Sequence, residues 1–209
     1  MSLKFYHAPM STAVITHLVL EELGVSYEAI QLDLKSGDTK KPEFLELNPN
    51  GKVPVIVHDG TVLWESAAIT MYLGEIFGVE KKLYPAPGPQ RGELMKWITW
   101  SNVTLGEAVA RFARNVQDWV PIEQRNARAG EVAKQELNAC LGVLDRALER
   151  KPFLGDNYSL ADTHLNSIVD WIRFMKIDLS SYTNLEVWSK RCQDRPAYSK
   201  VMASYSGNA

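Results

Sequence analysis

The chain has 209 residues, of which 45% are hydrophobic and 23% are charged, and its formal net charge is -2. These values are typical of a globular protein, so disorder, collagen and coiled coil are excluded as descriptions of the whole chain. A net charge near zero gives no attraction to DNA or RNA, whose binding proteins usually carry a basic surface. At roughly 150 residues per domain, the length fits one large domain or two small ones.

The sequence lacks the motifs that direct a protein to a membrane or to secretion. No apolar run reaches the ~18 residues of a membrane-spanning helix, and the first residues lack the apolar segment and cleavage site of a secretory signal. We therefore expect a cytoplasmic protein with neither membrane nor nucleic acid as partner. Cys140 and Cys192 are too widely spaced for a metal-binding pair, and the four histidines form no ligand motif. We expect no metal site and no cysteine nucleophile.

The charge is divided unevenly along the chain. Residues 1–80 hold 5 Lys and Arg against 11 Asp and Glu, a net of -6, whereas residues 81–209 hold 18 against 14, a net of +4. Such an asymmetry indicates two units with different surfaces. Residues 85–89 are rich in proline and glycine, as linkers are. We predict one domain at residues 1–80 and a second at residues 90–209.

The first domain alternates between strand and helix patterns. Strands are expected at residues 3–6, 26–34, 53–58 and 61–64, and helices at 13–23, 42–47 and 65–77. Gly24 ends the first helix as a C-terminal glycine would, and Asp59-Gly60 joins the last two strands as a hairpin. The predicted order is β-α-β-α-β-β-α, with the first two strands parallel.

Strand patterns almost vanish after residue 90. Helical runs fit residues 90–118, 124–149, 160–175, 184–193 and 197–204. Ser159 and Asp162 stand at the two positions of a capping box, in which each side chain satisfies a backbone N–H at the start of a helix. The second half is therefore predicted to be an all-α domain.

Four motifs occur in order along the chain. They are Phe5-Tyr6-His7-Ala8-Pro9-Met10-Ser11-Thr12; Glu43-Phe44-Leu45 with Asn48-Pro49-x-Gly51-Lys52-Val53-Pro54; Trp64-Glu65-Ser66-x-x-Ile69; and Leu160-Ala161-Asp162. With these motifs the chain resembles the cytosolic glutathione S-transferases over nearly its whole length. Its start is most similar to the serine-type members, the plant phi-like and related bacterial groups. The resemblance implies a thioredoxin-like, glutathione-binding α/β domain followed by an all-helical domain.

The resemblance implies that Ser11 activates the thiol of glutathione. A free thiol has a pKa near 8.5 and is mostly protonated at neutral pH. A hydroxyl at a helix N-terminus can stabilise the thiolate by a hydrogen bond, together with the helix dipole. Ser11 follows the first strand and aligns with the serine of the phi-like pattern. Three alternatives stay open, because Thr12 or Tyr6 could be the donor and Ser11 could serve only as a helix cap.

The middle motif is expected to hold the cysteinyl and glycyl parts of glutathione. Val53-Pro54 should form a cis peptide bond, which presents the backbone of Val53 to the extended tripeptide. Lys52 is placed to meet the glycyl carboxylate. The phi-like pattern has a histidine where this chain has Thr39 or Lys40, so Lys40 is a candidate for the same end. The simpler alternatives are a trans proline at a sheet edge and a solvated Lys52.

Glu65 and Ser66 open the third helix of the first domain. We expect Ser66 to cap this helix, whose exposed N–H groups suit the γ-glutamyl carboxylate, and Glu65 to pair with the γ-glutamyl ammonium. The alternative is a capping serine beside a solvated glutamate.

The second substrate is expected between the two domains. Trp100, Asn102 and Arg111 are candidates to line that cleft, although helical aromatic residues are often core residues instead. The implied activity is attack of the glutathione thiolate on a small hydrophobic electrophile, with glutathione as co-substrate, in a homodimer. The alternatives are a glutathione-dependent isomerase, reductase or dehalogenase, or a binding module without catalysis.

Overall fold

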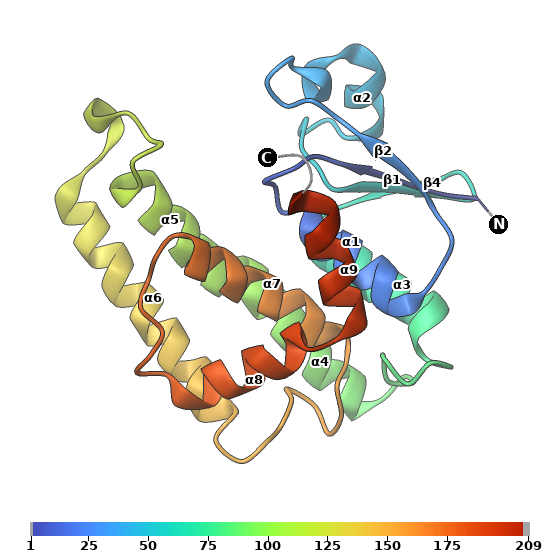
Figure 1. The fold of residues 1–209 in the computed structure, drawn as a ribbon. Coiled ribbons are helices and arrows are strands. Elements are labelled where there is room, and N and C mark those ends of the chain that lie inside the picture. The colour runs from blue at the N-terminus through green and yellow to red at the C-terminus, as the bar shows by residue number, and fades with distance from the viewer. Residues whose placement is uncertain (1, 207–209) are drawn as a thin grey trace. The chain divides into compact units, whose positions relative to one another are not determined.

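The computed structural model describes residues 2–206 (Figure 1), so the outer ends of the two predicted domains, residue 1 and residues 207–209, lie outside it. Contacts within the chain divide it into two compact units. The first unit combines the chain up to residue 86 with the chain from residue 195 onward, and the second is residues 87–194. The last helix therefore groups with the first unit, whereas the sequence places it in the helical domain.

A four-stranded mixed sheet forms the centre of the first unit. The strands are β1 (Leu3–His7), β2 (Glu28–Gln31), β3 (Val55–His58) and β4 (Thr61–Trp64), in the order β2-β1-β3-β4. Strand β1 is parallel to β2 and antiparallel to β3, which is antiparallel to β4. The predicted parallel pair and hairpin are both confirmed.

The helices of the first unit are α1 (Ala13–Leu23), α2 (Pro42–Leu47), α3 (Ser66–Leu73) and α9 (Pro196–Ser206). A 3₁₀ turn, η1 (Asp38–Lys40), precedes α2, and a π-helical turn, η2 (Gly74–Gly78), continues α3. The predicted order β-α-β-α-β-β-α is confirmed. Phe5, Leu20, Ile56 and Ile69 are fully buried, and they form the core between the sheet and the helices.

The second unit, residues 87–194, consists of helices and the loops that join them. Its elements are α4 (Pro89–Trp100), a π-helical turn η3 (Ser101–Leu105), α5 (Gly106–Val116), a 3₁₀ turn η4 (Ile122–Gln124), α6 (Ala127–Ala147), α7 (Leu160–Phe174) and α8 (Thr183–Gln193). The helix expected at residues 90–118 is thus interrupted by a π-helical turn. Among residues 2–206, no helix is both long and apolar enough to cross a membrane.

A buried carboxylate holds the start of α7. Oδ1 of Asp162 accepts hydrogen bonds from the backbone N–H of Leu154 and from Nε1–H of Trp188, both at 2.9 Å. Its Oδ2 accepts from the backbone N–H and the hydroxyl of Ser159, at 2.9 and 2.8 Å. The predicted capping box is therefore present. Burial raises the pKa of Asp162, whereas these four hydrogen bonds act to lower it.

Candidate active site

The strand register brings three of the predicted segments to one end of the sheet. Tyr6 near the end of β1 pairs with Val55 at the start of β3, and Val55 pairs with Trp64 at the end of β4. The turn after β1, the peptide before β3 and the start of α3 therefore lie at the same end. The Val53–Pro54 bond that precedes β3 is cis, as predicted.

Ser11 lies in the turn between β1 and α1 and is half-buried. Its hydroxyl donates to the carbonyl oxygen of Ala8 at 2.6 Å and accepts from the backbone N–H of Ala13 at 3.3 Å. The oxygen thus accepts from the first N–H of α1, but the N-cap position belongs to Thr12, so the simpler interpretation of Ser11 as the N-cap is wrong by one residue. The Ser11 hydroxyl donates its proton to the carbonyl oxygen of Ala8, so a sulfur at this site must replace that carbonyl as the acceptor.

The two alternative donors lie in different surroundings. Thr12 is exposed, occupies the N-cap position of α1 and makes no side-chain capping bond. Tyr6 is half-buried on β1, and its ring packs edge-on against Phe44 of α2, with 6.1 Å between the ring centroids. These contacts resemble those of a core aromatic residue.

The segment that precedes the cis proline contains two lysines and a tight turn. Nζ of Lys40 donates to the carbonyl oxygen of Gly51 at 3.2 Å, which ties the turn η1 to the segment before β3. Gly51 has φ +60°, and a Cβ there would lie 2.8 Å from the backbone oxygen of Thr39, so only glycine fits. The side chain of Lys52 is exposed, while its carbonyl accepts from the side-chain amide of Asn48 at 2.7 Å.

The start of α3 differs from the prediction in one respect. The helix begins at Ser66, and the N-cap position belongs to Glu65, so the expected role of Ser66 as N-cap is wrong. Glu65 is exposed and has φ 71°, which is unusual for a residue other than glycine and recurs at functional sites. Ser66 is buried in the first turn. This turn still offers backbone N–H groups of the kind that bind anions.

The predicted residues of the helical unit have partners within that unit. Trp100 is half-buried and packs edge-on against Trp97 at 5.4 Å between ring centroids. Asn102 lies in the π-helical turn η3, and its Oδ1 is 2.6 Å from Nε2 of the fully buried His164. Burial lowers the pKa of His164 to about 3, so this ring is neutral and its Nε2–H donates to Asn102.

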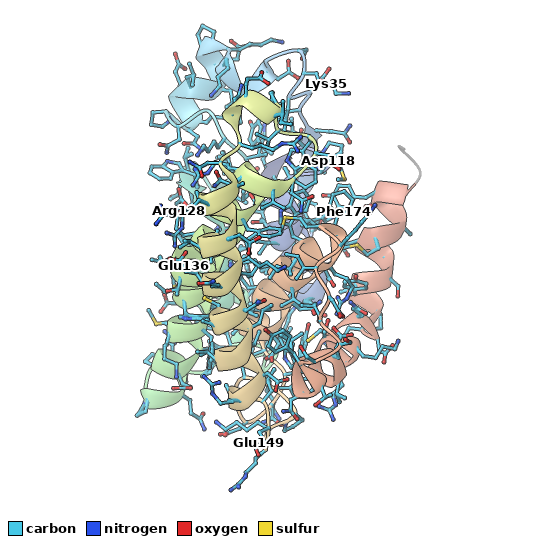
Figure 2. The ribbon with its side chains drawn as sticks, turned by 90° about the vertical axis from the view of Figure 1, so that its left-hand side faces the viewer. Lys35, Asp118, Arg128, Glu136, Glu149 and Phe174 are labelled. Carbon is cyan, nitrogen blue, oxygen red and sulfur yellow. The ribbon has the colours of Figure 1, made fainter. Side chains whose placement is uncertain are left out.

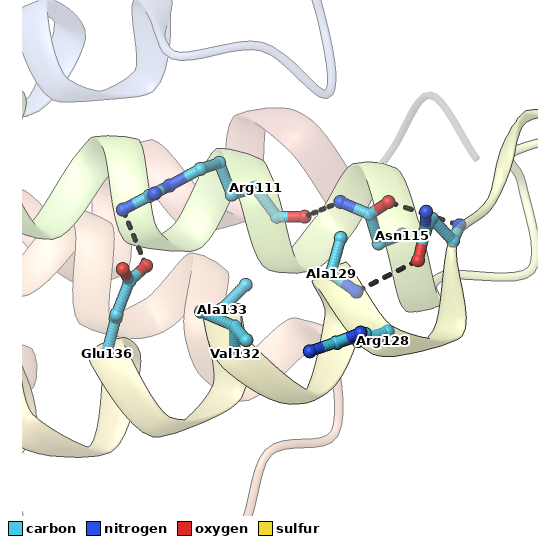
Figure 3. A pocket seen from close by; sticks show the side chains of 8 residues that line it. Arg111, Asn115, Arg128, Ala129, Val132, Ala133 and Glu136 are labelled. Atoms are coloured by element: carbon cyan, nitrogen blue, oxygen red, sulfur yellow. Dashed lines mark hydrogen bonds and ion pairs between the residues drawn. The ribbon is translucent and has the colours of Figure 1, made fainter.

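Arg111 lines a cavity of about 340 Å³ between α5 and α6 (Figure 3). Its guanidinium forms an ion pair with Glu136 of α6 at 2.5 Å and a longer one with Glu107 at 3.6 Å. Figure 2 shows Arg128 and Glu136 along the same helix, α6. The other lining residues are Asn115, Asn126, Arg128, Ala129, Val132 and Ala133. Arg111 therefore belongs to an open pocket of the helical unit, between α5 and α6.

A cluster of aromatic and histidine rings lies on the helix side of β1. The ring centroids of His7 and His17 are 5.9 Å apart, and Tyr205 of α9 contacts both. Burial, together with the nearby His7, lowers the pKa of His17 to about 4, and burial also lowers that of His7. Sequence reasoning missed this cluster, because 188 positions separate His17 from Tyr205.

The described chain offers no metal centre, since residues 2–206 contain no group of three or more His, Cys, Asp or Glu placed to hold an ion. Both cysteines, half-buried Cys140 and buried Cys192, belong to the helical unit. Burial raises the pKa of Cys140, which disfavours its thiolate.

Family models match both parts of the chain. The glutathione S-transferase N-terminal domain matches residues 1–75, and the glutathione S-transferase C-terminal domain matches residues 107–196. The chain belongs to the glutathione S-transferase family. Its predicted fold class, a thioredoxin-like α/β domain followed by a helical domain, is confirmed.

Relatives of this family member differ in activity. Glutathione S-transferase GstB of Escherichia coli is 32% identical over 188 residues, which cover 88% of this chain and 89% of that protein. Disulfide-bond oxidoreductase YfcG of E. coli is 31% identical over 209 residues, covering 94% and 93%. A glutathione transferase structure from Methylococcus capsulatus has 31% identity and a TM-score of 0.85 over 98% of each chain. The transferase URE2P6 of Phanerochaete chrysosporium, in complex with oxidized glutathione, has 25% identity and a TM-score of 0.90, covering 100% of this chain and 98% of its own.

Proposed function

We propose that this protein is a glutathione transferase that attaches the thiol sulfur of glutathione to small hydrophobic electrophiles. One observation carries the proposal. The register of β1, β3 and β4 gathers the Ser11 turn, the cis Val53–Pro54 peptide and the Glu65–Ser66 helix start at one end of the sheet. A peptide backbone partner, an anion-binding helix start and a hydroxyl donor are the groups that glutathione needs.

Each part of glutathione has a matching group at this end. The backbone of Val53 pairs with the cysteinyl residue as an added strand would. The first turn of α3 binds the γ-glutamyl carboxylate, and the exposed Glu65 pairs with the ammonium. Lys52 approaches the glycyl carboxylate, and Lys40 contributes by holding Gly51. The cysteinyl sulfur then lies toward the Ser11 turn.

Catalysis consists of stabilising the thiolate and orienting it. Loss of the thiol proton to solvent leaves a thiolate, and the hydroxyl of Ser11 turns from Ala8 to donate to the sulfur. The thiolate attacks the electrophilic carbon, a C–S bond forms, and the leaving group departs with the electron pair of the broken bond. Neither cysteine suits this chemistry, because Cys192 is buried and burial raises the pKa of the half-buried Cys140, which disfavours its thiolate.

Residues of the helical unit are proposed to select the electrophile. Of the three candidates, Trp100 offers an aromatic surface, while Asn102 and Arg111 are held by His164 and Glu136. We also propose a cytoplasmic homodimer, in which the acidic residues 1–80 of one chain face the basic residues 81–209 of the other.

A second activity, glutathione-dependent disulfide reduction, is favoured by the similarity to a disulfide-bond oxidoreductase. In this reaction the thiolate attacks a disulfide sulfur, forms a mixed disulfide and releases one thiolate of the substrate. A second glutathione thiolate then attacks the mixed disulfide, which yields oxidized glutathione and the second substrate thiol. The same Ser11 hydroxyl would stabilise the attacking thiolate.

The test compares Ser11→Ala with Thr12→Ala and Tyr6→Phe, using chlorodinitrobenzene and a small aliphatic disulfide as substrates. Loss of a hydrogen bond to a charged group costs about 1.5–3 kcal/mol, so Ser11→Ala should lower turnover roughly 10- to 100-fold. Glutathione affinity should stay nearly constant, and the other two variants should remain active. Turnover unchanged in Ser11→Ala would refute the role of Ser11. Retention on glutathione resin without turnover of either substrate would indicate a binding module.

A further inference from the structure

The C-terminal helix α9 packs against α1, the helix that follows the Ser11 turn (Figure 1). Arg195 donates two hydrogen bonds to the carboxylate of Glu22, at 2.6 and 2.7 Å, and this carboxylate is almost fully buried. One turn further along, Lys200 forms an ion pair with Glu21 at 2.6 Å. These contacts fix α9 along α1 and bring Tyr205 to the end of α1 that is closer to Ser11.

Tyr205 contacts both elements that meet at the Ser11 turn. Its ring centroid lies 6.4 Å from that of His7, the last residue of β1, and 5.6 Å from that of His17 in α1. Its hydroxyl is 3.1 Å from Nδ1 of His17. The two histidine rings also contact each other, and Phe5 stacks on His7 at 5.1 Å. The strand end and the helix are thus joined through one tyrosine ring.

The path from this cluster to the serine hydroxyl is short. His7 is buried and is followed directly by Ala8, whose carbonyl oxygen accepts the proton of the Ser11 hydroxyl at 2.6 Å. This carbonyl belongs to the Ala8–Pro9 peptide, which begins one residue after His7, so the packing of the His7 ring fixes the point from which the turn starts. The Nδ1 atom of His7 has no hydrogen-bond partner among the described residues, so packing carries this contact.

From this arrangement we propose that Tyr205 is a positioning residue for Ser11. By packing against both His7 and His17, it fixes the two sides of the turn and thereby the direction of the Ser11 hydroxyl. The inference rests on the proposed function, in which that hydroxyl stabilises the glutathione thiolate. It assigns to the C-terminal helix a part in activating the thiol, in addition to its packing against α1.

The charged and titratable groups around the cluster do not interfere with a measurement of the thiol pKa near neutral pH. His7 on β1, His17 and Glu21 on α1, Tyr27 before β2, and Lys200 and Tyr205 on α9 face one another. Burial lowers the pKa of both histidines and raises that of Tyr27 and of Tyr205. Near neutral pH the cluster rings stay uncharged, so a titration in that range reports the bound thiol.

The experiment measures the pKa of the thiol of bound glutathione from its thiolate absorbance and from the pH profile of kcat/KM. Tyr205→Ala removes the ring and should raise the pKa of the bound thiol by about one unit. At a pH below that pKa, the fraction of thiolate would then be about tenfold lower. Tyr205→Phe keeps the ring packing and should restore a value close to wild type. Ser199→Ala, a control at an exposed position of the same helix, leaves the ion pairs and the cluster intact and should not change the thiol pKa.

A double-mutant cycle distinguishes this inference from the proposed function. In the Ser11→Ala background, Tyr205→Ala should have no further effect on the thiol pKa, because its effect passes through Ser11. An effect that persists there overturns the inference but leaves the role of Ser11 intact. If Ser11→Ala itself leaves the thiol pKa unchanged, the proposed role of Ser11 fails.

A purely structural role of Tyr205 is also testable. Tyr205→Ala would then lower the urea midpoint while the thiol pKa stayed at its wild-type value, and that result overturns the inference. Tyr205→Leu fills more of the space without an aromatic ring, and it replaces Tyr205→Ala in every comparison if the alanine variant does not fold.

Discussion

Asp162 gives a direct measure of how the helical unit is held together, since its buried carboxylate accepts four hydrogen bonds from Leu154, Ser159 and Trp188. Asp162→Asn preserves the shape but replaces one oxygen with an NH₂ group, which then faces two donors. On the side of Ser159, the hydroxyl can rotate to accept from this NH₂, but the backbone N–H loses its acceptor. A buried donor without an acceptor costs about 1–3 kcal/mol, and the remaining bonds lose their charge assistance.

Asp162→Asn should therefore lower the free energy of unfolding by about 3–4 kcal/mol. This is a large part of the 5–15 kcal/mol that is typical of the free energy of unfolding of a domain. Urea unfolding followed by tryptophan fluorescence measures it, and Trp188 is itself a reporter beside Asp162. Asp118→Asn is the matched control, because that side chain is fully exposed in its pair with Arg125, and its loss should not change stability. A loss below about 1 kcal/mol for Asp162→Asn would refute the account of the four hydrogen bonds.

Two further predictions concern buried ionisable side chains. Because the pKa of His164 is lowered from 6.5 to about 3 in the folded state, its contribution to stability is complete above pH 6.5 and is lost as the pH falls toward 3. At about pH 5 the loss should approach 2 kcal/mol, and His164→Gln should show a correspondingly flatter dependence of unfolding free energy on pH; equal slopes would contradict this. Arg195→Met removes two hydrogen bonds from the buried carboxylate of Glu22 and should lower the free energy of unfolding by about 2 kcal/mol. This value lies between the losses typical of exposed and of buried ion pairs. Lys190→Met breaks an exposed pair and should have no measurable effect in the same urea titration, and equal losses in the two variants would rule out the effect of burial.

The order of elements could be predicted from the sequence because its signals are local. A short apolar run marks β1, the Asp59-Gly60 turn joins β3 to β4, and the capping box marks the start of α7. The π-helical turns at residues 74–78 and 101–105 could not be predicted, since a helical pattern does not reveal one extra residue in a turn.

The candidate site was predicted in part. The cis Val53–Pro54 bond was expected and is present, whereas the cap of α3 is displaced by one residue to Glu65. The partner of the Ser11 proton and the contact of Tyr205 with His17 depend on the folded turn and on residues far apart in the chain. No spacing in the sequence signals such contacts, because they arise only when α9 packs on α1.

The assignment of α9 to the first unit has a consequence for engineering. In topological terms, residues 87–194 are an insertion with two covalent tethers, one near residue 86 and one near residue 195. A chimaera that takes its thioredoxin-like half from this protein with a single crossover at residue 86 would separate Glu22 from Arg195 and His17 from Tyr205. A double crossover that keeps residues 195–206 with the first unit preserves both contacts, and this is the recombination that should yield a folded, exchangeable scaffold.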